Sequence, residues 1–85
     1  MDLDDDISPL KLGRLKWRCR RGMRELDKVT EGYLDEFYVA ASAQERAAFE
    51  RLLELPDPQL LALMFKHETA EDSIMEDVLA KMRQR

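Results

Sequence analysis

The sequence predicts an all-α fold, a compact single domain of five helices with short connections. Apolar residues recur at helical spacing along most of the chain, and candidate caps mark where one helix ends and the next begins. Three glycines and three prolines are too few for the many turns of an all-β fold. A chain of 85 residues can build one modest core. We expect this domain to occupy residues 8–85, after a flexible acidic leader at residues 1–7.

The first helix is predicted over roughly residues 9–20. Ser8 is a suitable N-cap, and Pro9 follows at the first helical position, where no N–H is needed. Gly13 weakens this helix by about 1 kcal/mol relative to alanine. The residues at core spacing are Leu12, Leu15 and Cys19, with Trp17 to one side.

The second helix is predicted to begin at Met23 or Arg24 and to be the longest, so we expect it to form the spine of the core. Gly22 precedes it after a cation-rich turn, which is typical of a helix C-cap with positive φ. Glu25 and Asp27 lie in the first turn, where acids suit the positive end of the helix dipole. The apolar stripe comprises Leu26, Thr30, Tyr33, Leu34, Phe37, Tyr38 and Ala41.

A capping box predicts the third helix, with Ser42 as N-cap and the Glu45 side chain reaching back to it. This helix is expected to end near Leu55, because Pro56 follows. Its inward residues are Phe49, Leu52 and Leu53.

Two further helices complete the expected domain. Asp57 is a suitable N-cap for the fourth, with Pro58 at its first position. Thr69 is expected to begin the fifth in a weaker capping box with Asp72. The buried residues are expected to be Leu60, Leu61, Met64 and Phe65 in the fourth helix, and Ile74, Val78, Leu79 (or Met75) and Met82 in the fifth.

Charge is distributed unevenly, although the net charge is only −4. Residues 1–6 carry −4, residues 11–24 carry +7, and residues 25–85 carry −7. Basic charge confined to one end favours contact with an anionic surface or with the acidic remainder of the chain. The single cysteine excludes an internal disulfide, and no signal, transit or membrane-spanning segment is evident. We therefore expect a cytoplasmic protein without membrane insertion.

Catalytic and metal chemistry are poorly supported by the residue types present. The only cysteine, Cys19, and the only histidine, His67, lie far apart in the sequence. A zinc site needs three or four ligands, and no glycine motif for phosphate binding is present. We expect that the protein is not an enzyme, that Cys19 is a small buried hydrophobe, and that His67 faces solvent or caps a helix.

The segment from Trp17 to Asp27 contains the candidate binding residues, for which three interpretations compete. Nucleic-acid binding is disfavoured, because the sequence pI of about 5.0 is low for such a domain. Protein binding is favoured by Gly22, which lets another backbone approach, and by arginines that can bind carboxylates bidentately. A purely structural role explains these residues equally well. The candidate partner-binding residues are Trp17, Arg20, Arg21, Gly22, Met23, Arg24, Glu25 and Asp27.

One pattern in this segment is specific: Trp17-x-Cys19-Arg20-Arg21-Gly22-Met23-x-Glu25-Leu26-Asp27. It closely resembles the signature of the bacterial SdhE-type FAD assembly factors, which are relatives of the mitochondrial succinate dehydrogenase assembly factor 2. The resemblance covers most of residues 12–82 and includes the stretches 49–54 and 57–60 and the Leu63-Met64 pair. It departs where the family often has a His-Gly-x-Pro turn, because residues 65–69 lack that glycine and proline.

The resemblance implies a five-helix domain that binds the flavoprotein subunit of succinate dehydrogenase, and in some bacteria that of fumarate reductase. It implies that the protein promotes covalent attachment of FAD to a histidine of that subunit. FAD would be the cofactor of this client, and we expect none bound tightly here, because no dinucleotide-binding fingerprint is present. The family's motif residues are Arg21, Gly22 and Glu25, with Arg20, Met23 and Asp27 beside them.

Two alternatives remain beside this function. Some members of the family have been proposed as antitoxins, which would make the protein a regulatory binder of a membrane-associated toxin. A small RNA-binding protein is the third possibility. We expect a monomer in each case.

Overall fold

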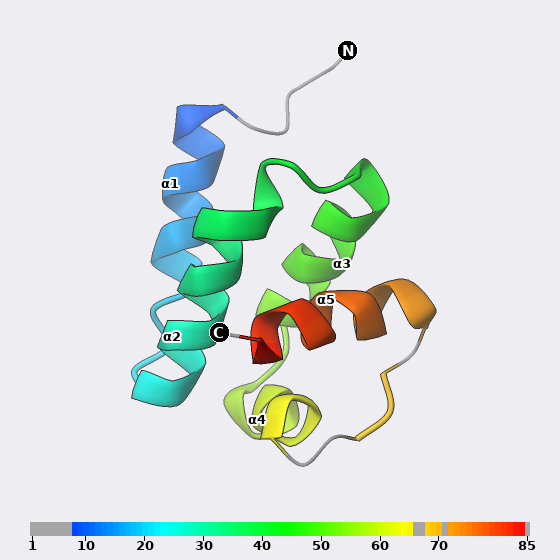
Figure 1. Ribbon diagram of the computed structural model, residues 1–85. Coiled ribbons are helices and arrows are strands. Elements are labelled where there is room, and N and C mark those ends of the chain that lie inside the picture. The colour runs from blue at the N-terminus through cyan, green and yellow to red at the C-terminus, as the bar shows by residue number, and fades with distance from the viewer. Residues whose placement is uncertain (1–7, 66–67, 71, 85) are drawn as a thin grey trace.

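A computed structural model describes residues 8–65, 68–70 and 72–84. Within these ranges the chain forms five α-helices, one π-helical turn and no strand, which confirms the all-α prediction (Figure 1). The expected leader, His67 and the turn around it lie outside the described residues. The elements are α1 (Pro9–Arg18), α2 (Arg24–Tyr33), η1 (Leu34–Tyr38), α3 (Ala43–Leu53), α4 (Asp57–Phe65) and α5 (Ser73–Arg83).

Side-chain caps begin three of the helices. Ser8 and Ser42 cap α1 and α3 as predicted, each accepting a hydrogen bond from the backbone N–H three residues later, at 3.2 and 3.1 Å. The fifth helix begins differently, because Asp72 and not Thr69 is its N-cap. The Asp72 carboxylate accepts a hydrogen bond from the N–H of Met75 at 2.8 Å. A carboxylate at this end also interacts favourably with the helix dipole, which a threonine hydroxyl does not.

The predicted second helix is continuous from Arg24 to Tyr38, but its last turn is a π-helix. In an α-helix, residues five positions apart lie on different faces, whereas a π-helical turn contains about one residue more. This wider turn brings Tyr33 and Tyr38 to the same side, where both rings contact Phe49 with centroid distances of 4.5 and 5.8 Å. The sequence pattern predicted the buried residues but not this change of helix type.

The core lies where α5 meets the other helices. α5 packs against α2, α3 and α4, so this helix, and not the predicted second helix, is the spine of the molecule. It can do so because four of its apolar residues are buried on the faces turned to these neighbours. The side chains with less than 2% exposure include Cys19, Leu26, Tyr33, Tyr38, Phe49, Leu52, Leu60, Met64, Val78, Leu79 and Met82.

Three further predictions for buried or capping side chains are wrong. Asp57, predicted as the N-cap of α4, is the first residue of that helix. Phe65 is 46% exposed, because every residue of α4 from Leu60 to Phe65 is apolar and only one face of the helix packs against the core. Glu45 does not reach back to cap α3. Its carboxylate instead accepts a hydrogen bond from the hydroxyl of Tyr33 at 2.6 Å and pairs with the ammonium of Lys81 at 2.9 Å.

Candidate functional site

The candidate site is built on the loop between α1 and α2. Cys19 is the C-cap of α1, so Gly22 lies three residues beyond it and is not the predicted helix C-cap. Gly22 has a φ of +85°, and this confirms the positive φ expected of it. A residue with a side chain is strained in that region, which explains the glycine. α2 then begins at Arg24, as predicted.

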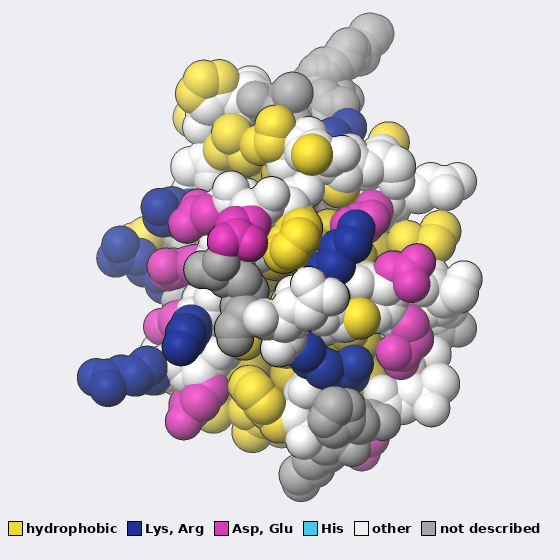
Figure 2. Space-filling view, in the orientation of Figure 1, with side chains coloured by type: hydrophobic (Ala, Val, Ile, Leu, Met, Phe, Trp, Pro, Cys, Tyr) yellow, Lys and Arg dark blue, Asp and Glu magenta, His cyan; other side chains and the backbone are white. Residues whose placement is uncertain are grey.

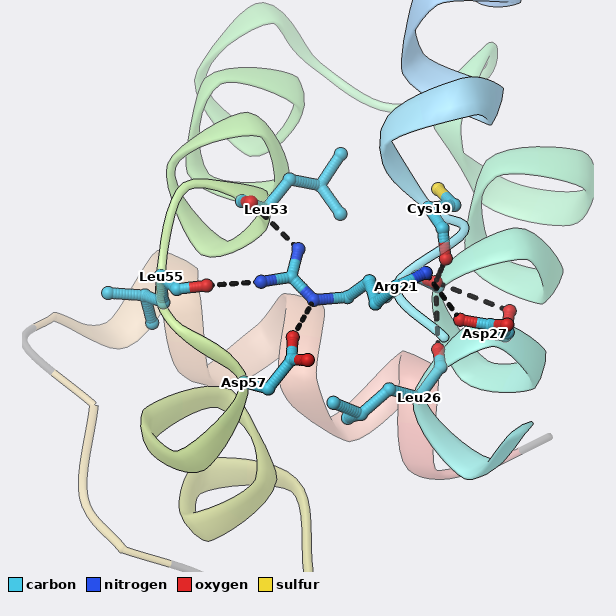
Figure 3. A network of polar contacts seen from close by, with 8 residues as sticks. Cys19, Arg21, Leu26, Asp27, Leu53, Leu55 and Asp57 are labelled. Atoms are coloured by element: carbon cyan, nitrogen blue, oxygen red, sulfur yellow. Dashed lines mark hydrogen bonds and ion pairs between the residues drawn. The ribbon is translucent and has the colours of Figure 1, made fainter. Parts of the chain in front are cut away.

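The side chain of Arg21 extends from this loop to the junction of α3 and α4 (Figure 3). Its Nε donates to Oδ1 of Asp57 at 2.6 Å, and Nη1 donates to the carbonyl of Leu53 at 2.8 Å. Nη2 donates to the carbonyl of Leu55. The guanidinium thus satisfies carbonyls that the end of α3 leaves without helical partners. The side chain of Arg21 is only 11% exposed, and its charge is paired with Asp57 of the same chain.

Two side chains of α2 hold the same loop from the other side (Figure 3). Oδ1 of Asp27 accepts a hydrogen bond from the backbone N–H of Arg21 at 2.7 Å. The buried hydroxyl of Thr30 lies 3.2 Å from the carbonyl oxygen of Cys19 and 2.8 Å from that of Leu26. Thr30 therefore connects the end of α1 to α2. The loop is held from α2 as well as from the junction of α3 and α4.

The charged residues at the other positions of the segment face solvent. Arg20, Arg24 and Glu25 are exposed, and within the described ranges none of their three side chains makes a hydrogen bond or an ion pair. Gly22 is exposed between them, and a Cβ atom added to it would meet no other atom within 4 Å. The structure therefore separates the predicted residues into an inner pair, Arg21 and Asp27, and an outer group centred on Gly22.

The two predicted apolar anchors also differ in their surroundings. The side chain of Trp17 is 73% exposed on α1. Met23 is half-buried and packs against the core at the start of α2. Trp17 is consequently the larger apolar surface that this region offers to a partner.

Charges of both signs surround Gly22. Lys28 and Glu31 of α2 line a shallow depression together with Arg20, Gly22 and Arg24. Figure 2 shows basic and acidic side chains interleaved along the edge of the molecule that α1 and α2 form. Such a surface is suited to a protein partner with a complementary arrangement of both signs.

The site offers no activated nucleophile among the residues described. Burial raises the pKa of the Cys19 thiol to about 11, although the hydrogen bond with Thr30 and the charge of Arg21 act in the opposite direction. With no exposed surface, Cys19 is the small buried hydrophobe that we predicted. No group of three or more His, Cys, Asp or Glu side chains in the described ranges could hold a metal ion. None of the described helices combines the length and apolar character needed to cross a membrane.

Sequence reasoning missed Asp57 as part of this site. We predicted it to be a helix N-cap, because Asp-Pro is a common helix start. The contact with Arg21 joins residues 36 positions apart, and no local pattern encodes such a pairing.

Comparison with known proteins shows which proteins this chain resembles in sequence. The family model described as "Flavinator of succinate dehydrogenase" matches residues 13–85. A protein named FAD assembly factor SdhE from Methylococcus capsulatus is 45% identical over 71 residues, which cover 84% of this chain and 86% of the relative. The protein of that name from Idiomarina loihiensis is 39% identical over 85% of this chain and 80% of its own length. The protein of that name from Coxiella burnetii is 36% identical over 89% of this chain and 93% of its own length.

Proposed function

Since this chain belongs to the family described as the flavinator of succinate dehydrogenase, we propose that it is an FAD assembly factor. Its client is the flavoprotein subunit of succinate dehydrogenase, and it promotes covalent attachment of FAD to that subunit. The relatives described above carry the name FAD assembly factor, and they match most of this chain. The pattern from Trp17 to Asp27, which carries the resemblance, lies within the matched range.

The observation that carries the proposal is the division of the motif into an inner and an outer part. Arg21 and Asp27 hold the loop by partly buried hydrogen bonds. Arg20, Gly22 and Glu25 are left exposed on it. A docking surface needs this combination, because a rigid surface loses little conformational entropy when a partner binds. Gly22 permits close approach of the client's backbone, and Arg20 and Glu25 make charge-assisted hydrogen bonds with it.

The proposed mechanism requires no catalytic group on this chain. Covalent flavin attachment is chemistry of the cofactor and of the client's own side chain. A bound helper can hold the client in its reactive geometry, and correct orientation contributes up to roughly 7–11 kcal/mol in ideal cases. The assembly factor thus acts as a binding protein and not as an enzyme, with no tightly bound FAD of its own.

The finer features of the proposal follow from the same surface. We propose, as the sequence leads us to expect, that the protein acts as a cytoplasmic monomer. The flavoprotein of fumarate reductase is a second client wherever it presents the same surface as that of succinate dehydrogenase. An antitoxin-like role would use the same exposed residues with a membrane-associated toxin as the partner.

The function is tested by measuring covalent FAD on the succinate dehydrogenase flavoprotein by in-gel fluorescence. Purified flavoprotein and FAD are incubated with and without this protein. We expect faster covalent attachment in its presence. An equal rate in both reactions would refute the proposed function. Co-purification of a small membrane protein from the native host, in place of the flavoprotein, would favour the antitoxin role.

The docking surface is tested by three substitutions. Gly22→Ala and Gly22→Arg both place a side chain at positive φ, which costs about 1–2 kcal/mol of stability. Only Gly22→Arg adds bulk to the surface, so we expect it to abolish pull-down of the flavoprotein while Gly22→Ala retains most binding. Glu25→Ala removes an exposed charge from the first turn of α2 and is expected to weaken binding while lowering the melting temperature by no more than a few degrees. Wild-type binding by both Gly22→Arg and Glu25→Ala would place the interface elsewhere.

A further inference from the structure

α1 carries apolar residues on two opposite faces. The inward face contains Leu15 and Cys19, which are buried in the core. The outward face contains Leu10, which is 68% exposed, and Trp17, which is 73% exposed. At 100° per residue, the directions of these two pairs differ by roughly 170–180° around the helix. Leu10 and Trp17 lie two turns apart on one outward stripe, so neither side chain packs in the core.

Gly13 lies on the same outward stripe, between Leu10 and Trp17. The three residues have the spacing i, i+3 and i+7, which is the spacing of a helix face that packs against another helix. A Cβ added at Gly13 would meet no atom within 4 Å, so this chain does not need a glycine there for packing. The result is an open groove on α1 with Leu10 and Trp17 at its two ends. A glycine in a helix interior costs stability and lets another helix approach closely.

Two arginines border this groove. Arg14 and Arg18 line it beside the apolar residues. Both are exposed, and neither side chain makes a hydrogen bond or ion pair with any part of the chain that the structure describes. The neighbouring Lys11, in contrast, is paired with Glu50 at 3.2 Å. Arg14 and Arg18 are one turn apart, so two carboxylates with the same spacing on a partner helix can meet them.

We infer that this face of α1 binds an acidic amphipathic helix of the client flavoprotein, an inference that rests on the proposed function. A bulky apolar side chain of the client helix enters the groove above Gly13 and contacts Leu10 and Trp17. Asp or Glu residues one turn apart on that helix pair with Arg14 and Arg18. The α1 face is thus a second contact region beside the loop of Gly22, and Trp17 is its central anchor, since exposed tryptophans and arginines dominate binding energy at interfaces.

A membrane surface is the competing occupant of a basic face with exposed tryptophan. A helix that lies in a membrane interface needs a broad apolar face, whereas α1 offers two large apolar side chains over ten residues. Arg14 and Arg18 border the groove one turn apart, which matches carboxylates on a partner helix, whereas a lipid surface presents no fixed spacing of charges. These observations favour a protein helix.

The inference is tested by binding of purified variants to the purified flavoprotein. Gly13→Leu fills the groove while favouring the helix, so its melting temperature should equal or exceed that of the wild type. Trp17→Ala removes the anchor, and Arg14→Glu reverses one charge. We expect each to weaken binding by about tenfold or more. Ala80→Leu adds comparable bulk at an exposed position of α5 and should leave binding unchanged.

The outcomes separate this inference from the proposed function. Gly22→Arg serves as the reference for lost binding at the loop. Wild-type affinity in Gly13→Leu, Trp17→Ala and Arg14→Glu, with binding lost in Gly22→Arg, would overturn the α1 contact alone. No binding by the wild-type protein would overturn both. A photo-reactive benzoylphenylalanine in place of Leu10 should crosslink to a client helix that carries Asp or Glu one turn apart, and a crosslink to a segment without acids would overturn the inference.

The membrane alternative is tested with vesicles of phosphatidylglycerol and phosphatidylcholine. We expect no co-sedimentation of the wild-type protein at physiological salt. Co-sedimentation that Trp17→Ala abolishes, together with wild-type flavoprotein binding by that variant, would assign the α1 face to lipid and overturn the protein contact.

Discussion

Arg20 and Arg21 are neighbours with the same side chain, but their surroundings differ. Arg21 is 11% exposed and donates to Asp57 and to two carbonyl oxygens. Arg20 is exposed and makes no such contact with the described residues. The first stabilises the loop and its attachment to α3 and α4, whereas the second is available to a partner. Substitution of Arg21 should therefore lower the stability of the protein, whereas substitution of Arg20 should weaken its binding to a partner.

We predict that Arg21→Ala lowers the free energy of unfolding by about 2–3 kcal/mol, because it leaves a carboxylate and two carbonyls without their donor. For a domain of this size that corresponds to a melting temperature lower by roughly 10–20 °C. Arg20→Ala should change the melting temperature by no more than a few degrees while weakening binding of the flavoprotein. Equal melting temperatures for the two variants in thermal denaturation would contradict the structural role of Arg21.

The thiol of Cys19 allows a second test at the residue scale. Its pKa of about 11 is two units above the ordinary value of 9.0, so the reactive thiolate is about a hundredfold less populated near pH 8. We predict that a maleimide or a disulfide reagent labels the native protein at least a hundredfold more slowly than the unfolded protein. The rate is followed by mass spectrometry, with guanidinium-unfolded protein as the control. Equal rates would show that Cys19 is accessible in the native state.

At the scale of elements, carboxylates of α3 join the helices around it. Glu45 accepts a hydrogen bond from Tyr33 of α2 and pairs with Lys81 of α5. Glu50 does the same between Tyr38 of η1 and one lysine of α1. Burial and the bond to Glu45 raise the pKa of Tyr33, so its hydroxyl stays a donor throughout the physiological range. These contacts connect α3 to α1, to α5 and to the continuous helix that α2 and η1 form.

We predict that the contact of Glu45 makes stability fall at acid pH. Burial opposes its ionisation, but the hydrogen bond from Tyr33 and the charge of Lys81 outweigh burial and lower the pKa of Glu45 below 4.5. Because the folded-state pKa is depressed, the stabilisation is present above the unfolded-state pKa near 4.5 and is lost as the pH falls through the folded-state pKa. The melting temperature of Glu45→Gln should be lower than that of the wild type at pH 7.

The pH dependence of the melting temperature separates the loss of this carboxylate from a general loss of stability. Between pH 7 and pH 3 the melting temperature of Glu45→Gln should decline less than that of the wild type, since glutamine does not titrate. Glu54→Gln, which alters an exposed glutamate at the end of α3, should follow the wild-type curve. Parallel curves for Glu45→Gln and wild type would show that this carboxylate does not contribute to the acid sensitivity.

At the scale of the whole molecule, the protein is electrically asymmetric. Residues 11–24 carry +7, and residues 25–85 carry −7. The basic segment comprises α1 and the loop after it, which are the elements of the two proposed contact regions. Such a distribution orients an approaching protein of complementary charge and raises the association rate more than it slows dissociation.

We predict that association with the flavoprotein slows as salt increases. Raising the ionic strength from about 50 to 500 mM shortens the screening length from more than 10 Å to less than 5 Å, so the association rate constant should fall about tenfold. The dissociation rate constant should change much less, as surface plasmon resonance can measure. Arg14→Glu should flatten the salt dependence. An association rate independent of salt would show that the charge asymmetry does not guide binding.

Much of the fold could be predicted from local sequence patterns. The five helices, the caps at Ser8 and Ser42, and the positive φ of Gly22 all depend on residues within one or two turns. The start of α5 was misplaced, because Thr69 and Asp72 offered two plausible caps close together. The π-helical turn of η1 was not predicted, because it arises where Tyr33 and Tyr38 must both reach Phe49 on another helix.

The sequence by itself determined where this protein has helices and which short segment carries its distinctive residues. Caps, turns and apolar stripes depend on residues three or four positions apart, so the local order of residues suffices to specify them. Only the tertiary structure decided that Arg21 points inward and Arg20 outward. The partners of Arg21 lie 32 to 36 positions away, and the proximity of α3 and α4 to this loop exists only once the helices have packed.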